Sequence, residues 1–245
     1  MTILRWGEWA DAVIDFILQV KSAENFLIIS DTGTDTAIGN ACLVAGIKAK
    51  ANAQLLVVPE MRAGRSQSLE FGSAAGAVLG SDVILGLCEI NNDSIQNAMY
   101  SSREKGARVS ICDAKNNEAW VIEGVLDVDL ALMTEVAQKI CALWSVTELC
   151  RVTSNVGTDI SFQLKGRPSM PGDGRAIKQG TLDFFPGATP SVAPVENTIN
   201  GTIVVDGSVD AGPVSTPITL EVVSGYVTEI KGEEDADLFR KRLES

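Results

Sequence analysis

The sequence predicts an α/β protein in two parts: an amino-terminal domain with a parallel sheet between helices, then an antiparallel β-rich domain of the α+β kind. Up to residue 148, apolar runs without polar alternation are separated by helical stretches, which is typical of a parallel sheet covered on both faces. From residue 149, alternating runs are broken by Gly, Pro and Asn, which is typical of antiparallel strands. We therefore expect domains at residues 1–148 and 149–245, and 245 residues are enough to give each a core.

The amino-terminal domain is expected to open with an amphipathic helix, because apolar residues recur at helical spacing from Trp6 to Val20. Short apolar runs then predict buried strands at 26–30, 54–58, 82–87 and 107–112. Helical patterns predict further helices at 68–80, 93–105 and 129–148. The helix after the first strand should end near Gly46, with Asp31, Thr32 or Thr34 as its cap.

The carboxy-terminal domain is expected to consist mainly of short strands. The segments that predict them are "CRVTSN", "TDISFQLKG", "GTIVVDG" and "ITLEVVSGYVTEIKG". The last of these contains a two-residue hairpin turn at Ser224 and Gly225. A final helix should follow, with Ala236, Phe239 and Leu243 on one side.

The composition excludes some classes of partner. The chain carries 32 acidic and 20 basic residues, a net charge of −12, which argues against binding to a nucleic-acid backbone. No apolar run approaches the roughly 20 residues that a membrane helix needs. The opening residues show no signal-peptide pattern, and the five scattered cysteines form no CxxC pair. We expect a soluble cytoplasmic protein with reduced thiols.

Several common catalytic constellations are missing from the sequence. The chain has no histidine, so it offers neither an imidazole ligand nor a histidine base. Gly33 and Gly39 do not fit a GxGxxG dinucleotide motif, and no GxSxG, SxxK or calcium-loop spacing occurs. "PGDGR", residues 171–175, is expected to be a mobile loop. We therefore expect no cofactor and no metal.

Three segments of the second half resemble one family. They are "GTDISFQLKGRP", "DFFPGATPSVAPVENTINGTIVVDGSV" and "PITLEVVSGYVTEIKG". They are similar to the aminopeptidase T (M29 metallopeptidase) superfamily, and more so to its branch that contains 2,5-dihydroxypyridine dioxygenase. The resemblance is strongest over residues 157–232, while "ISDTGTDTAIGNACLVAG" fits the amino-terminal domain of that superfamily more loosely. It implies an aminopeptidase T-like fold, a dimer and a cavity between the domains that accepts a peptide or a ring substrate.

The chain departs from this family in its metal ligands. The aminopeptidases carry a glutamate in a PxGE motif, and the matching position in "FPGAT" is Thr189, although the dioxygenase branch lacks that glutamate too. The family's other ligands lie beyond the "VVSGYVTEIKGEEDADLF" region, and this sequence ends at Ser245. A shortened relative of this kind resembles the precursor-peptide-binding proteins of ribosomal peptide natural-product pathways, such as crocagin biosynthesis.

Five residues of the resembling segments are candidate ligand-binding residues. Thr158 and Asp159 begin the second domain, Arg167 could clamp a carboxylate, and Glu196 and Asn200 offer groups to a peptide backbone. Each also has a purely structural interpretation: a turn acceptor for Asp159, a turn at Asn200 and a solvated surface charge for Arg167.

The sequence leaves three functional hypotheses. The first is a non-catalytic protein that binds a peptide, such as the precursor of a ribosomal peptide natural product, in the interdomain cleft or at a sheet edge. It would be a homodimer or a heterodimer with a related chain. The second is a fragment or subunit of a metal-dependent aminopeptidase or ring-cleaving dioxygenase whose ligands come from elsewhere. The third is a metal-free enzyme that uses carboxylate or lysine chemistry in the cavity that the family resemblance implies.

Overall fold

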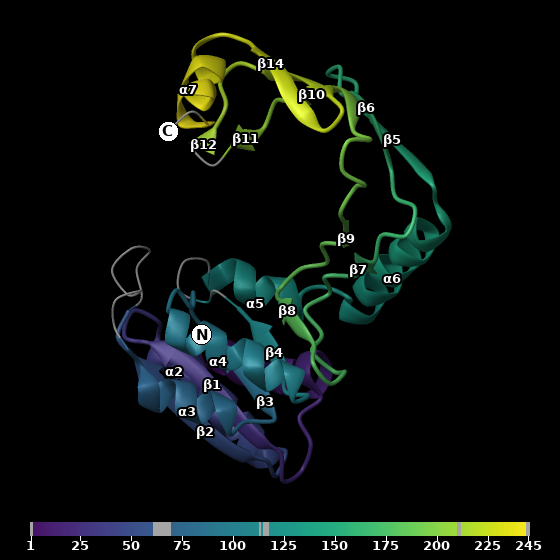
Figure 1. Ribbon diagram of the computed structural model, residues 1–245. Helices are drawn as coiled ribbons and strands as arrows, with labels where there is room; N and C mark the ends of the chain where they lie inside the picture. The colour runs from purple at the N-terminus through teal and green to yellow at the C-terminus, as the bar shows by residue number, and fades with distance from the viewer. Residues whose placement is uncertain (1, 61–69, 113, 115–117, 210–211, 244–245) are drawn as a thin grey trace. The chain divides into compact units, whose positions relative to one another are not determined.

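The computed structural model describes residues 2–60, 70–112, 114, 118–209 and 212–243, and its contacts divide the chain into two units (Figure 1). Unit 1 comprises Met1–Ala137 and Pro171–Thr189, and unit 2 comprises Gln138–Met170 and Pro190–Ser245. This division differs from the single boundary expected after residue 148, because a segment of the second half returns to the first unit.

Unit 1 is built on a parallel sheet with the strand order β2-β1-β3-β4-β8. Its strands are β1 (Asn25–Asp31), β2 (Asn52–Val58), β3 (Val83–Gly86), β4 (Arg108–Ile111) and β8 (Leu182–Phe184). The first four confirm the predicted strands. The fifth, β8, pairs in parallel with β4, with Val109 opposite Leu182 and Ile111 opposite Phe184. A segment that the sequence analysis placed in the antiparallel domain, without predicting a strand there, therefore completes the parallel sheet.

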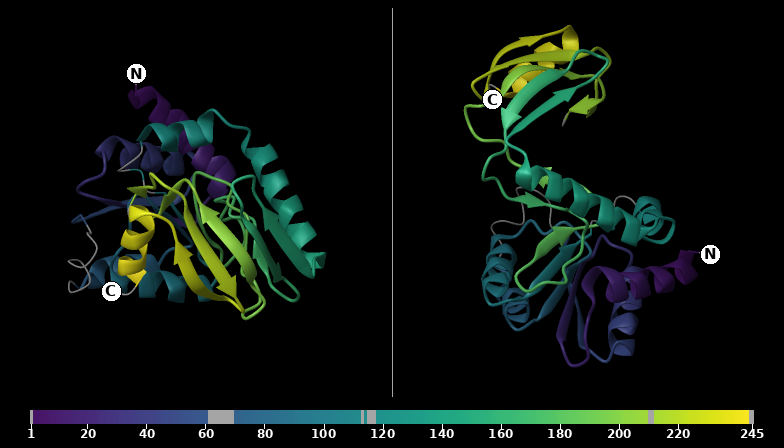
Figure 2. Two further views of the ribbon diagram at one scale, coloured as in Figure 1. Left: turned by 90° about the horizontal axis from the view of Figure 1, so that it is seen from above. Right: turned by 90° about the vertical axis from the view of Figure 1, so that its right-hand side faces the viewer.

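Helices cover both faces of this sheet, as the right-hand view of Figure 2 shows. One face carries α1 (Thr2–Ala12), the π-helix η1 (Val13–Leu18), α2 (Thr36–Lys48) and α5 (Glu118–Leu126); the other carries α3 (Gly72–Leu79) and α4 (Asp93–Glu104). The side chains of β1 alternate between the two cores: Phe26 and Ile28 face the first, Leu27 and Ile29 the second. This is why the strand has an unbroken apolar sequence.

The helix α2 is capped by a residue that the sequence analysis did not select. Asp35 accepts a hydrogen bond from the Ala37 amide at 2.9 Å and is the N-cap. The expected cap Asp31 is buried and instead accepts bonds from the Gly33 amide at 2.9 Å and the Thr34 amide at 2.8 Å. The prediction was wrong because Asp31 ends the strand and folds its carboxylate back over the loop.

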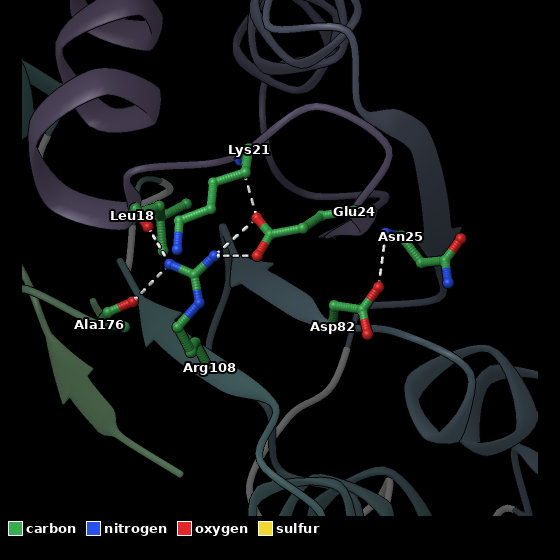
Figure 3. A network of polar contacts seen from close by, with 7 residues as sticks. All are labelled: Leu18, Lys21, Glu24, Asn25, Asp82, Arg108 and Ala176. Atoms are coloured by element: carbon green, nitrogen blue, oxygen red, sulfur yellow. Dashed lines mark hydrogen bonds and ion pairs between the residues drawn. The ribbon is translucent and has the colours of Figure 1, made fainter. Parts of the chain in front are cut away.

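A buried arginine ties together three segments at the amino-terminal edge of this sheet (Figure 3). Arg108, the first residue of β4, donates to the backbone carbonyl of Leu18 and to that of Ala176 at 3.1 Å. Its other nitrogen contacts both carboxylate oxygens of Glu24, at 2.8 and 2.7 Å. The end of η1, the turn before β1 and the segment before β8 are thus held by one side chain.

Unit 2 is built on an antiparallel sheet with the order β14-β13-β10-β6-β5. Its strands are β5 (Leu149–Thr153), β6 (Asp159–Gln163), β10 (Asn200–Val205), β13 (Ile218–Val223) and β14 (Tyr226–Lys231). The hairpin between β13 and β14 turns at Ser224 and Gly225, both with positive φ (50° and 82°), which confirms the predicted turn.

The remaining elements of unit 2 are short or peripheral. The helix α7 (Glu234–Leu243) packs on β13 and β14, with Ala236 buried against Ile218 and Leu220. Two small ladders join β7 (Ser169–Met170) to β9 (Ser191–Val192) and β11 (Ser208–Val209) to β12 (Gly212–Pro213). The long helix α6 (Leu130–Val146) runs through the division between the units. Among the helices that the structure describes, none has the length and apolarity to cross a membrane.

Candidate functional site

The segment "DFFPGAT" interlocks with the loop "PGDGR" in unit 1. The Thr189 amide donates to the Gly172 carbonyl at 2.9 Å. At Gly172 φ is +54°, and a Cβ there would lie 2.3 Å from the Thr189 carbonyl oxygen; at Gly174 a Cβ would lie 2.4 Å from Cβ of Phe185. Only glycine fits both positions, so the loop expected to be mobile is held closely against the family motif.

Two carboxylates face this junction. Asp173 is buried and accepts the Arg175 amide at 3.2 Å, while Asp183 is half-buried. Asp183 accepts the Gly174 amide at 3.1 Å and the Phe184 amide at 2.8 Å. Burial raises the pKa of Asp183, and the nearby charge of Asp173 raises it further. These two acids are the most chemically distinctive pair of the junction, and the sequence analysis did not select them.

Aromatic packing against α1 holds the "DFFPGAT" segment in place. Phe185 is buried and stacks on Trp9 with ring centroids 5.8 Å apart, and Trp9 donates its indole N–H to the Val121 carbonyl at 3.0 Å. On the same face, the Arg175 guanidinium lies 4.4 Å from the centre of the Phe16 ring. Unit 1 therefore fixes the backbone of the motif through side chains of α1 and η1.

The donor set at this motif does not fit the metal that the family resemblance implies. Thr189 offers a hydroxyl where the aminopeptidases have a carboxylate, and it is exposed. Within the residues that the structure describes, no group of three or more Cys, Asp or Glu side chains is placed to hold a metal ion. We therefore derive no metal-dependent step from these residues.

All five candidate residues predicted from the sequence lie in unit 2. Thr158 bridges β6 and β10, because its hydroxyl accepts the Val204 amide at 2.9 Å. Asn200 begins β10; its side-chain oxygen accepts the Ser224 amide at 2.9 Å, and its amide group donates to the Thr198 carbonyl at 3.1 Å. Both side chains thus connect neighbouring strands.

The three charged candidates form two ion pairs. Asp159 accepts two bonds from Arg151, at 2.7 and 2.6 Å, and this contact lowers the pKa of Asp159. Arg167 and Glu196 pair with each other, bringing together the segments before β7 and β10. The guanidinium proposed to clamp a ligand carboxylate already holds one from its own chain, so a ligand would have to compete with Glu196. Ligand binding by the five residues stays a prediction.

Comparison with known proteins identifies the family. The family model for NicX, 2,5-dihydroxypyridine 5,6-dioxygenase, matches residues 15–245. The chain belongs to the NicX family. Its fold is similar to that of the 2,5-dihydroxypyridine dioxygenase from Pseudomonas putida KT2440, with a TM-score of 0.81 at 17% identity, over 100% of this chain and 72% of that one. It is also similar to wild-type AmpT from Thermus thermophilus, with a TM-score of 0.67 at 13% identity, over 98% and 74%. No curated protein sequence matches it.

These comparisons confirm the predicted fold class and the resemblance to the dioxygenase family, and they show that the fold is also similar to that of AmpT. At 17% and 13% identity, the two solved structures show similarity of fold only. This NicX-family chain therefore has a metalloenzyme scaffold, and its activity has to be argued from its own residues.

Proposed function

We propose that this NicX-family chain is a non-catalytic peptide-binding protein that adds an extended peptide to β5, the free edge of the antiparallel sheet. The observation that carries the proposal is the exposed edge of β5, with the apolar side chains of Leu149 and Val152. Recognition of this kind uses main-chain hydrogen bonds for affinity and side-chain contacts for selectivity.

The backbone of β5 has a row of groups directed away from its neighbour. The Ser154 amide donates to the Thr158 carbonyl across the loop that joins β5 to β6, at 3.0 Å. Because bonded pairs alternate along an antiparallel ladder, every second residue before Ser154 faces β6 and the intervening ones face away. The backbone N–H and C=O groups that point away from β6 are those of Leu149, Arg151 and Thr153.

The side chains of β5 suit an apolar partner strand. Leu149 is 67% exposed and Val152 is 46% exposed. An exposed edge with apolar side chains is the kind that natural sheets normally protect against pairing. Such an edge is therefore a candidate docking strand.

The opposite edge of the same sheet, β14, is protected in the usual ways. The Ile230 carbonyl accepts a hydrogen bond from Arg240 of α7 at 2.6 Å, and Lys231 pairs with Glu229 at 2.9 Å. Charged side chains and a covering helix discourage strand addition. β5 also carries an ion pair, Arg151–Asp159, but among the described residues no side chain bonds to its outward backbone groups, and this difference selects β5 as the docking edge.

The peptide interpretation is tested by removing one outward-facing amide. Thr153→Pro deletes an N–H that points away from β6, whereas Thr153→Ala keeps it. Extended peptides selected from a random display library on the wild-type protein are measured by calorimetry against both variants, with circular dichroism as the folding control. We expect Thr153→Pro to weaken binding at least tenfold and Thr153→Ala to leave it nearly unchanged. Equal affinities, or no selected peptide, would refute docking at β5.

The alternative is a subunit or fragment of a metal-dependent aminopeptidase or ring-cleaving dioxygenase, and membership of the NicX family favours it. Its ligands would come from another chain or from residues outside this sequence. Stoichiometric iron, zinc or cobalt in the purified protein, with turnover of peptides or dihydroxypyridines that a chelator abolishes, would establish it. We also propose self-association, as a homodimer or with a related chain, which light scattering measures.

A further inference from the structure

A cavity lies in unit 1, on the face of the sheet that α3 and α4 cover, and Phe184 at its border is also part of the "DFFPGAT" segment. It has a volume of about 460 Å³ and is bordered by the end of β4, by β8, by one side of α4 and by the loop after β3. This volume is within the range of roughly 300–1,000 Å³ typical of small-molecule sites. The carboxyl ends of parallel strands are also where open α/β sheets commonly bind ligands.

The cavity exists because β8 extends the sheet beyond its helical cover on this face. α4 packs over β4, whereas Leu182 of β8 enters the core of this face only partly. Phe184, two residues along the same strand and therefore on the same face, is 60% exposed. The β8 addition thus leaves an apolar sheet surface next to a helix.

The lining of the cavity suits a flat apolar ring. Met99, Ile111 and Leu182 supply an apolar base, while the exposed rings of Tyr100 and Phe184 border it. Aromatic rings bind other rings by stacked or edge-to-face contacts, which add to the stabilisation from the buried apolar area. Without such a partner, both aromatic rings remain exposed to solvent.

One cationic group of the cavity is held in place without an acidic partner. The Nε of Arg103 donates to the Gly180 carbonyl at 3.1 Å, and its guanidinium carbon lies 6.0 Å from the centre of the Tyr100 ring. Among the described residues, no carboxylate pairs with Arg103. A guanidinium fixed through Nε presents its remaining N–H groups in the geometry that a carboxylate prefers.

We propose that this cavity binds an aromatic carboxylate, with its ring against Tyr100 and Phe184 and its carboxylate on Arg103. The proposal does not depend on peptide binding at β5. The same chemistry occurs in a small free molecule and in the carboxy-terminal residue of a peptide that ends in an aromatic side chain. Glu89, exposed at the border of the cavity, would additionally accept a hydrogen bond from an ammonium group of such a ligand.

Two probes that differ in one group test the proposal by calorimetry: N-acetylphenylalanine, which has a free carboxylate, and its amide. We expect the acid to bind at least tenfold more tightly than the amide, because a hydrogen bond between a guanidinium and a carboxylate is stronger than one to a neutral amide. Arg103→Gln should abolish this preference, and Phe184→Ala, an exposed position, should weaken both probes. Arg151→Gln, in unit 2, is the matched control and should change neither.

The source of the ligand is tested by a short peptide that ends in phenylalanine, with its carboxylate free or amidated. Binding of the free peptide acid would indicate a peptide terminus, and binding of N-acetylphenylalanine alone would indicate a small molecule; both support the site. The absence of binding by all acids, or acid binding that Arg103→Gln and Phe184→Ala leave unchanged, would overturn the proposal. Retained melting temperatures show that the variants fold.

Discussion

Replacing Arg108 by methionine should destabilise unit 1 more than any exposed charge substitution. The guanidinium is 6% exposed and Glu24 is 22% exposed, so the variant leaves a largely buried carboxylate without its partner. The carbonyls of Leu18 and Ala176 lose their donor as well. Removing one member of a buried pair costs about 3–5 kcal/mol, and the partial exposure of Glu24 places the expected loss near 3 kcal/mol.

This loss is measured by urea unfolding with tryptophan fluorescence, since three of the four tryptophans lie in unit 1, among them the buried Trp6 and Trp9. For a chain of this size, about 3 kcal/mol corresponds to a fall of roughly 6–12 °C in the melting temperature. Arg151→Met, which breaks an exposed ion pair, is the control and should leave the midpoint nearly unchanged.

The double variant Arg108→Met/Glu24→Leu separates the ion pair from the carbonyl bonds. It should recover part of the loss, because no buried carboxylate then remains unpaired. If Arg108→Met unfolds at the same urea concentration as Arg151→Met, the network in Figure 3 contributes little and the reasoning fails.

The remaining predictions concern the interlocked loops. Gly172→Ala should lower the free energy of unfolding by about 2–4 kcal/mol, since its Cβ meets the Thr189 carbonyl at a positive φ. Gly166→Ala is the control and should cost less, because Gly166 also has a positive φ (+76°) but nothing lies within 4 Å of the added Cβ; equal losses would contradict the steric argument. Because the pKa of Asp183 is raised on folding, its contribution to stability is lost as pH rises through that pKa. Asp183→Asn should therefore gain stability relative to wild type between pH 3 and pH 7 in urea titrations, and a pH-independent difference would refute it.

Local patterns account for most of the fold that could be predicted. The apolar runs at 26–30 and 107–112 correspond to strands that share two cores, and the turn at Ser224 and Gly225 follows from its own chemistry. The β8 strand could not be predicted in the same way, since its pairing with β4 joins residues more than seventy positions apart. Its three residues carry too short a pattern to show which sheet they enter.

The site was less predictable than the fold, for a related reason. The family resemblance directed attention to Arg167 and Glu196, but a sequence cannot show that the two pair with each other. It also gave no weight to Asp173, whose only signal was a glycine on either side, in "PGDGR". Two glycines that flank an acid indicate that another segment packs closely against this backbone. The sequence does not show which segment it is, and the structure identifies it as the one that contains the Thr189 carbonyl.

The interlocked loops explain why the family motif indicates shape more securely than chemistry. Backbone contacts at Gly172 and close packing of Phe185 at Gly174 fix the path of "DFFPGAT". Thr189 takes part in this through its backbone, while its side chain is exposed, so another residue there would leave the path intact. A chain can therefore retain the fold of the NicX family whether or not it retains a reactive centre, because the contacts that hold the scaffold are separate from the side chains that would carry the reaction.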